Sequence, residues 1–448
     1  MKKRLWTLLT AALLAAALAC GALAQEGGET AFYDSLPPAL CVTQETIETE
    51  AQKNVFVRHT YPDTAQDPVD AQMRALIDGM AEKGMAYLPE ARPLEAAYLD
   101  AGAVITRSGT GIMSFLALCE VSNDREQLYT AFETRVYDME SGEQVMLTDV
   151  FPAKSEAWAL LRSEAQKQLR AAFPGREIDE AALAALLDGE AIKAAPFTLG
   201  AARLTLSFHA GDLFPGQQTL LHVHLPYGDI RGLMTPRFQA QTDNSRYKMV
   251  ALTFDDGGAR GSTRKVLDVL RRSGAQATFF VIGRNLSKNH DILARQQNSG
   301  YSIQSHTYNH KYTKELSRKK AMDEKELFAA ELAQITGLEP TMMRSPGGDD
   351  DFYVEKEIGY PIIHWSLASG DSGNKHVDKI TKRVLLNVGD GDIVLMHDIN
   401  SLCHQYAGRV IDELNRQGYL MVTVEELFAH KGVPLESNKV YFSPDRVE

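Results

Sequence analysis

Cysteine is scarce in this chain. Its 448 residues include four cysteines, at positions 20, 41, 119 and 403, and no two of them form the C-x-x-C spacing of redox and zinc motifs. If the first 24 residues are removed, three cysteines remain, an odd number with no close pairing. The sequence therefore argues against a disulfide framework.

An excess of basic residues is also lacking, since the formal net charge is −12. Residues 1–245 carry 20 basic and 32 acidic side chains, whereas residues 246–448 carry 27 of each. Such a chain has no electrostatic footprint for nucleic acid and repels anionic polymers. We expect no nucleic-acid partner, and a long substrate must be held by local contacts. The oligomeric state cannot be read from the sequence.

The amino terminus has the features of an export signal. Lys2-Lys3-Arg4 precedes an apolar run from Leu5 to Leu18, and Ala22-Leu23-Ala24 suits signal peptidase. We expect a signal peptide over 1–24 and a secreted or envelope-associated protein. Two alternatives stay open: a lipoprotein cleavage site, because Ala17-Leu18-Ala19 precedes a cysteine, and an uncleaved membrane anchor.

Residues 30–235 mix strand-like and helical patterns, which predicts a smaller α+β domain. The strand-like stretches lie at 54–57, 103–121, 128–137, 197–208 and 220–225, and the helical patterns at about 73–80 and 156–173. His222-Val223-His224 places two imidazoles on one face of a strand, a pattern that favours a half-exposed strand over a metal site. The polar stretch 236–247 is expected to be a linker.

From Met249 onward, short apolar runs alternate with amphipathic helical patterns. The runs are Met249–Phe254, Thr278–Ile282, Tyr301–Gln304, Thr341–Arg344, Ile362–Trp365, Ile393–Met396 and Leu420–Val424. This alternation predicts an α/β fold with a parallel sheet, and seven units favour a barrel over an open doubly wound sheet. No glycine-rich dinucleotide fingerprint follows the first run.

Polar residues stand at or just beyond the carboxyl ends of these runs, where barrel enzymes build their active sites. They are Asp255-Asp256, His306, Arg344, Asp371 and His397. Adjacent residues of an extended segment point in opposite directions, so one aspartate can bind a metal while the other faces a reacting water. Asp-Asp-Gly alone is an ordinary strand-to-turn sequence, and its partners decide its meaning.

His306 and His310 stand four residues apart, a spacing that places both imidazoles on one side of a helical turn and suits metal capture. Two histidines and one aspartate leave open positions on a divalent metal, which can activate water and polarise a carbonyl. We expect zinc, with cobalt or manganese as alternatives.

Residues 248–431 resemble the polysaccharide deacetylase (NodB homology) domain of carbohydrate esterase family 4. The resemblance rests on five ordered motifs: Thr253-Phe254-Asp255-Asp256-Gly257, His306-Thr307-Tyr308-Asn309-His310, Arg344-Ser345-Pro346-Gly347, Asp371 and Leu395-Met396-His397. It implies a distorted (β/α)7 barrel, preceded by the α+β domain and followed by a tail at 432–448. The element order of the preceding domain is loosely similar to the extracellular domain of some peptidoglycan deacetylases.

The same resemblance implies roles for the motif residues. Asp255 would be the general base, paired with Arg344, and His397 the acid that protonates the leaving nitrogen. Asp256, His306 and His310 would bind the metal. Pro346 would lead into Gly347, whose backbone N–H would stabilise the oxyanion, and Asp371 would orient His397.

Two motifs depart from the family pattern. Many relatives carry a tyrosine or phenylalanine at the position of Gly347, so stacking of a sugar must come from elsewhere or the groove is wider. The fourth motif reads Ala368-Ser369-Gly370-Asp371-Ser372 and lacks the first acid and the tryptophan of Asp-x-x-Asp-Trp. His364 and Trp365 are expected to pack beneath the site.

The resemblance implies metal-dependent hydrolysis of N-acetyl groups from an amino-sugar polysaccharide, with cell-wall peptidoglycan as the expected substrate and chitooligosaccharide as another. Two alternatives stay open. One is an esterase for O-acetylated xylan, which uses the same machinery. The other is a non-catalytic envelope protein that binds glycan, which the altered fourth motif suggests.

Overall fold

The computed structural model describes residues 42–44, 55–64, 66–89, 96–109, 111–123, 125–258, 260–348 and 358–447. The expected export signal at 1–24 lies outside these residues. Within the described ranges, no helix combines the length and the apolar character needed to cross a membrane.

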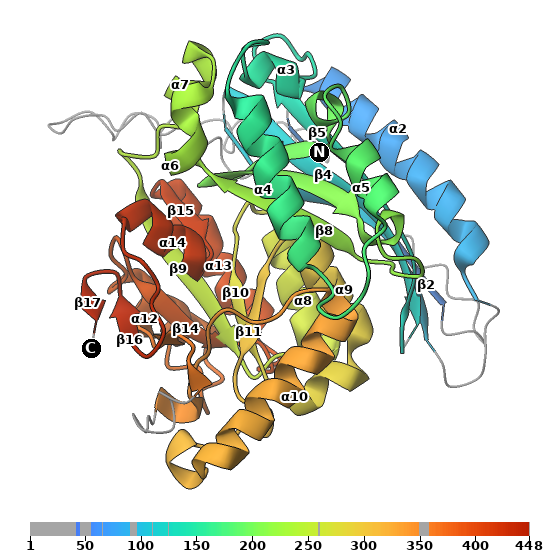
Figure 1. Cartoon of the computed structure of the whole chain (residues 1–448). Coiled ribbons are helices and arrows are strands. Elements are labelled where there is room, and N and C mark those ends of the chain that lie inside the picture. Colours follow the sequence, from blue (N-terminus) through green and yellow to red (C-terminus); the bar gives the residue numbers. More distant parts are fainter. Residues whose placement is uncertain are drawn as a thin grey trace, which may run out of the picture. The chain divides into compact units, whose positions relative to one another are not determined.

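The first half of the chain contains a five-stranded sheet in the order β1-β2-β3-β4-β5. Figure 1 labels β2, β4 and β5 of this sheet. Its strands are β1 (Val42–Gln44), β2 (Val55–Tyr61), β3 (Ala97–Arg107), β4 (Ile112–Asn123) and β5 (Gln127–Asp138). β2 and β3 run parallel and the other neighbours antiparallel. Helix α2 (Asp67–Gly84) joins the parallel pair. Its Val69, Met73, Ile77 and Met80 recur at helical spacing and are buried in one cluster with the sheet.

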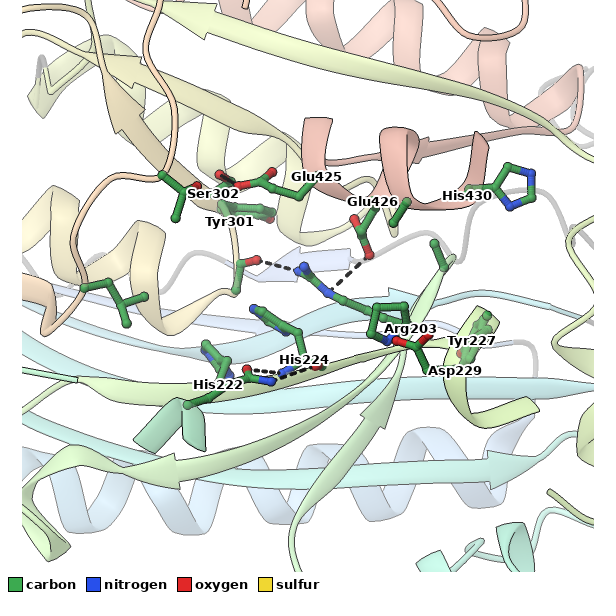
Figure 2. Close-up of a pocket in the computed structure, with 18 of the residues that line it drawn as sticks. Arg203, His222, His224, Tyr227, Asp229, Tyr301, Ser302, Glu425, Glu426 and His430 are labelled. Atoms are coloured by element: carbon green, nitrogen blue, oxygen red, sulfur yellow. Dashed lines mark hydrogen bonds and ion pairs between the residues drawn. The ribbon is translucent and has the colours of Figure 1, made fainter. Parts of the chain in front are cut away.

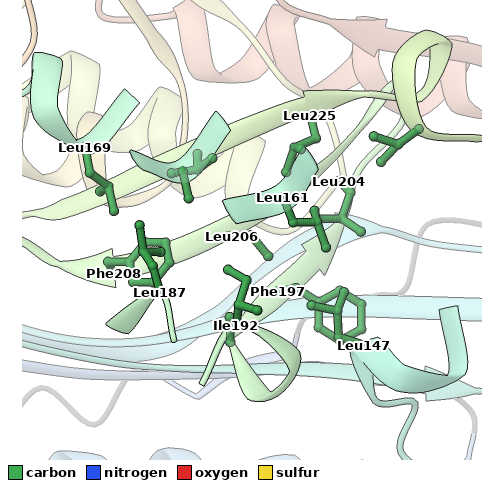
Figure 3. Close-up of a cluster of buried hydrophobic side chains, with 14 of the residues drawn as sticks. Leu147, Leu161, Leu169, Leu187, Ile192, Phe197, Leu204, Leu206, Phe208 and Leu225 are labelled. Atoms are coloured by element: carbon green, nitrogen blue, oxygen red, sulfur yellow. The ribbon is translucent and has the colours of Figure 1, made fainter. Parts of the chain in front are cut away.

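A second layer follows in the chain. It contains the three-stranded sheet β6 (Phe197–Leu199), β7 (Arg203–His209) and β8 (Leu220–Pro226), with helices α3 (Leu147–Val150), α4 (Ala157–Ala171), α5 (Glu180–Leu186) and α6 (Tyr227–Ile230). Leucines from α4, β7 and β8 form its core, shown in Figure 3. The helix predicted at 156–173 is confirmed as α4, and the strand predicted at 220–225 as β8. The stretch 197–208 forms two antiparallel strands, β6 and β7, rather than one.

The stretch expected to be a linker contains helix α7 (Pro236–Gln241). Phe238 of this helix is buried in the same core as α4, and Thr242 is 1% exposed. The stretch is mostly polar, so its composition did not predict a helix. Phe238 is the aromatic residue that anchors the helix. The division of the chain at 235 and 248 stays a proposal.

The second half contains a parallel sheet in the order β11-β10-β9-β14-β13, and β15 also pairs with β9. The strands are β9 (Lys248–Asp255), β10 (Thr278–Val281), β11 (Ser302–Ser305), β13 (Leu367–Ala368), β14 (Ile393–His397) and β15 (Tyr419–Val422). Helices α8 (Arg260–Arg271), α9 (His290–Asn298), α10 (Arg318–Thr336), α12 (Val377–Leu385), α13 (Cys403–Arg416) and α14 (Val424–Lys431) alternate with them. The predicted α/β class and parallel sheet are confirmed.

Beyond β11 the sheet continues through single bridges from Ser305 to Met343 and from Met343 to Ile362. β12 (Ile362–Ile363) then pairs with β16 (Val440–Ser443), which lies next to β17 (Arg446–Val447). The run Thr341–Arg344 thus provides one bridging residue, Met343, rather than the expected strand, since prolines flank the run at 340 and 346. No ladder joins β12 to β13 within the described ranges, so regular strand pairing is interrupted at this point of the barrel.

Charged residues connect the five-stranded sheet with the barrel helices. Asp100 of β3 pairs with Arg58 of β2, with Arg264 of α8 and with Arg295 of α9, at 2.7, 2.5 and 2.8 Å. Burial opposes the charge of Asp100, but the three arginines hold its pKa well below the usual value. Glu120 of β4 likewise pairs with Arg271, at 2.8 Å.

A cavity of about 1080 Å³ lies between β7 and β8 on one side and α14 and the start of β11 on the other. Figure 2 shows Arg203 reaching from β7 to Glu426 of α14, an ion pair of 3.2 Å. His222 is 9% exposed and contacts the carbonyl oxygens of Gln297 and Asn298, so the expected half-exposed strand is wrong at this position.

Candidate active site

The candidate site lies at the carboxyl end of strand β9, at the end of the barrel strands opposite the cavity described above. Asp255 is its last residue and is 3% exposed. Asp256 has a φ of 74°, in the left-handed region, so the chain leaves the extended conformation there. Oδ2 of Asp255 and Oδ1 of Asp256 therefore both approach Nε2 of His306, at 3.8 and 3.6 Å. The expectation that the two carboxylates point in opposite directions is wrong.

Asp398 lies behind this turn. It is fully buried, and a Cβ atom at Gly257 would lie 3.2 Å from its Oδ2. The same oxygen accepts a 2.7 Å hydrogen bond from Thr263 of α8, and burial raises the pKa of Asp398 to about 7. The close approach explains why glycine follows the two aspartates.

His306 follows β11 directly and is 2% exposed. Its Nδ1 lies 2.9 Å from the carbonyl oxygen of Arg344, so Nδ1–H donates and Nε2 keeps its lone pair toward Asp256. Burial lowers the pKa of His306, which favours the neutral form that binds metals. The oxygen of a backbone carbonyl thus fixes the tautomer.

His310 approaches the same carboxylate, with Nε2 3.1 Å from Oδ1 of Asp256. The segment between the histidines is not the expected helical turn, because Thr307 and His310 have φ values of 60° and 58°. The loop nevertheless brings the two imidazole rings to a centroid distance of 5.1 Å.

The three residues fit a divalent metal. One ligand atom each from Asp256, His306 and His310 can be chosen so that all lie within 4.8 Å of one another. Oδ1 of Asp256 is buried and accepts no hydrogen bond of regular geometry. An acceptor that is buried without a donor and faces two imidazole nitrogens suits a cation with nitrogen and oxygen ligands, such as zinc.

Arg344 is fully buried and fixes the other aspartate. Its Nη1 donates to Oδ1 of Asp255 at 2.6 Å and to Oγ1 of Thr253 at 2.8 Å. The remaining nitrogens donate to the carbonyl oxygens of Ile363 and His364, and the guanidinium lies 4.1 Å from the ring centroid of Phe280. Such a guanidinium has little freedom to move, so it holds one carboxylate oxygen in place.

His397 ends β14, in register with Asp255 of β9. Its Nδ1 lies 2.8 Å from Oδ1 of Asp371, and its backbone N–H donates to Oδ2 of the same carboxylate. Burial disfavours the imidazolium, but the hydrogen bond and the charge of Asp371 raise the pKa of His397 to about 9. The hydroxyl group of Tyr406 in α13 also donates to Asp371.

Pro346 and Gly347 lie in a short helical turn, η7 (Pro346–Gly348), directly after Arg344. Pro346 is buried, and Gly347 has a φ of 66°. As expected, His364 and Trp365 pack beneath, because a Cβ atom at Gly348 would lie 2.9 Å from the Trp365 ring and 3.1 Å from the His364 ring.

The structure thus gathers Asp255, Asp256, His306 and His310 around one point, and it connects Arg344 and Asp371 to that group through Asp255 and His397. Three further residues beside the site were not predicted from the sequence: Thr253, Tyr406 and Tyr312, whose ring lies against Gly347. Thr253 lies within the first motif, and Tyr312 lies two residues after the second motif. Their closeness to these motifs could have pointed to both residues. Tyr406 lies in a helix and carries no such signal.

The family model for polysaccharide deacetylase matches residues 242–362. A peptidoglycan-N-acetylglucosamine deacetylase of Bacillus cereus is 37% identical over 196 residues, which are 41% of this chain and 90% of that protein. The chain belongs to the polysaccharide deacetylase family.

A further member of the polysaccharide deacetylase family, the peptidoglycan-N-acetylglucosamine deacetylase PgdA of Listeria monocytogenes, is 36% identical over 195 residues. The match covers 44% of this chain and only 41% of the Listeria protein. Among solved structures, the peptidoglycan deacetylase PdaC from Bacillus subtilis is 31% identical, with a TM-score of 0.41 over 42% of this chain and 92% of that one.

Proposed function

We propose that this chain hydrolyses N-acetyl groups of an amino-sugar polysaccharide in the cell wall, with release of acetate. The observation that carries the proposal is the cluster of Asp256, His306 and His310 beside the Arg344-bound Asp255. A metal-ligand set next to a fixed carboxylate and a protonated histidine contains the groups that amide hydrolysis requires.

Asp256, His306 and His310 would hold a divalent metal, for which zinc is the best fit to the nitrogen and oxygen donors. When bound, the metal would acidify a water molecule and polarise the acetyl carbonyl. The carbonyl oxygen of Arg344 keeps the ligand nitrogen of His306 deprotonated.

Asp255 would act as the general base. Arg344 occupies its Oδ1, whereas Oδ2 faces the histidine side of the site, 3.8 Å from Nε2 of His306. The two oxygens thus have separate tasks: one is held, and the other is placed to accept a proton from the attacking water. Asp256 would keep the separate task of metal ligand.

His397 would act as the general acid. Because its pKa is raised to about 9, the imidazolium form prevails at neutral pH and can give a proton to the leaving nitrogen. Asp371 holds the ring through Nδ1, which leaves Nε2 as the proton donor. The pairing of His397 with Asp255 on the neighbouring strands β14 and β9 supports these two roles.

The backbone N–H of Gly347, in the turn that Pro346 begins, would stabilise the oxyanion that forms on the acetyl group. Peptidoglycan is the proposed substrate, because relatives from Bacillus cereus and Listeria monocytogenes are named for it. A secreted or envelope-associated location agrees with this substrate and with the export-signal pattern at 1–24.

Acetate release from peptidoglycan, chitooligosaccharide and acetylxylan tests the proposal. We expect release from the first two, loss of activity with a chelator, recovery with zinc, and a rate at least about 100-fold lower for Asp255→Asn and His306→Ala. His430→Ala, an exposed histidine of α14, serves as the matched control. Release that survives the chelator or both substitutions contradicts the mechanism, and release from acetylxylan alone identifies an esterase.

A further inference from the structure

Tyr312 is a large aromatic residue at the edge of the candidate site. It follows His310 by two residues, and 39% of its surface is exposed. Its backbone is fixed, since its carbonyl oxygen accepts a 2.9 Å hydrogen bond from the N–H of Glu315 and the next residue, Thr313, is fully buried. The ring is therefore presented to solvent by an ordered segment.

The ring of Tyr312 lies against the backbone of Gly347. A Cβ atom at Gly347 would approach Cε1 of Tyr312 to 2.8 Å, which is closer than real Cβ atoms come to their neighbours. With a φ of 66°, Gly347 would also be strained by a side chain. A side chain at position 347 would therefore require the ring of Tyr312 to move from its present position.

This arrangement places an aromatic ring against the residue proposed to bind the oxyanion. Tyr312 is two residues from a proposed metal ligand, and it touches the residue whose N–H would bind the oxyanion. A sugar whose acetyl group reaches Gly347 must pass close to this ring. The apolar C–H face of a pyranose packs well on an exposed aromatic ring, and Lys314, 5.6 Å from the ring centroid, is a long side chain that can move aside.

We propose that Tyr312 is a specificity-determining residue whose ring stacks on the sugar that carries the acetyl group. This inference rests on the proposed function and extends it, because it assigns the sugar platform to the loop after His310 rather than to position 347. Glycine at 347 then leaves room for the ring, and the site selects pyranosides over acetylated compounds that lack a flat apolar face.

Binding of penta-N-acetylchitopentaose to zinc-loaded protein tests the inference. The measurement uses an Asp255→Asn background, which prevents turnover, and calorimetry as the readout. We expect Tyr312→Ala to weaken binding about tenfold, the factor that corresponds to ~1.4 kcal/mol. The conservative Tyr312→Phe keeps the ring and should recover most of the affinity. Tyr87→Ala, an exposed tyrosine of the first half, is the matched control.

Steady-state kinetics on enzyme with Asp255 unchanged distinguish a sugar-stacking role of Tyr312 from a purely structural role. Tyr312→Ala should raise KM about tenfold with kcat within about threefold of the wild type, and zinc affinity should not change. Unchanged KM, or a parallel loss of kcat and zinc affinity, overturns the inference. Failure of the proposed function looks different, because the wild type itself would then release no acetate from the oligosaccharide.

Discussion

Tyr406 donates a 2.5 Å hydrogen bond to Oδ2 of Asp371, whose other oxygen holds His397. Tyr406 is fully buried in the core of α13, so this donor is fixed. The carboxylate that orients the proposed acid is thus shared between a histidine and a tyrosine. Tyr406 supplies a polar contact to the His397–Asp371 pair. The altered fourth motif, which lacks its first acid and its tryptophan, does not provide this contact.

Tyr406→Phe should shift the pH profile. His397 acts while protonated, so kcat/KM of the wild type should fall as the pH rises through about 9. Loss of the hydroxyl donor leaves more negative charge on Asp371, which stabilises the imidazolium and raises its pKa. We expect the alkaline limb to move upward by roughly half a unit, or ~0.7 kcal/mol. The weaker acid should also lower kcat a few-fold.

The control is Tyr419→Phe, which removes the hydroxyl group of another buried tyrosine, one that contacts the carbonyl oxygen of Val388. Its alkaline limb should match the wild type. An unchanged or downward-shifted limb in Tyr406→Phe contradicts the role assigned to the tyrosine.

A zinc titration should distinguish variants of the proposed metal ligands from a variant of the proposed acid. His306→Ala and His310→Ala each remove one nitrogen ligand, so we expect zinc affinity to fall by at least about 100-fold, the upper range for loss of a supporting contact. His397→Ala should keep the zinc affinity and lose the activity. Competition with a chromophoric chelator measures both. Equal zinc affinity in all three variants would disprove the ligand assignment.

Asp100→Asn should destabilise the folded protein strongly. The substitution removes the carboxylate that Arg58, Arg264 and Arg295 share in a buried environment. Breaking a buried pair from one side costs about 3–5 kcal/mol. Urea unfolding of the purified protein measures the effect. Glu180→Gln, which removes the exposed partner of Arg170, should leave the unfolding midpoint nearly unchanged, and similar midpoints for both variants would contradict the prediction.

The sequence predicted those parts of the site that depend on local pattern. Asp255, His306, Arg344 and His397 were found because polar residues at the ends of apolar runs meet at one end of a parallel sheet. Helix α2 and strands β2 to β5 were also predicted, since their hydrophobic spacing is regular, whereas the short β1 was not.

The remaining features depend on tertiary contacts that no spacing encodes. The left-handed conformation of Asp256 follows from Gly257 and the buried Asp398 behind it, which lie 141 positions apart in the chain. Tyr406 contacts Asp371 from helix α13, whose sequence has the pattern of an ordinary amphipathic helix. Helix α7 is anchored because the side chain of Phe238 packs into a hydrophobic core built by other elements.

The ion pairs between the five-stranded sheet and helices α8 and α9 also make the stability of each half depend on the other. A barrel released from this sheet would keep Asp291 beside Arg264 and Asp268 beside Arg295 but lose Asp100. The sheet alone would keep Arg58 beside Asp100 but lose the two barrel arginines. Separation of the two halves would therefore leave charged groups on both sides with fewer partners than they have in the intact chain.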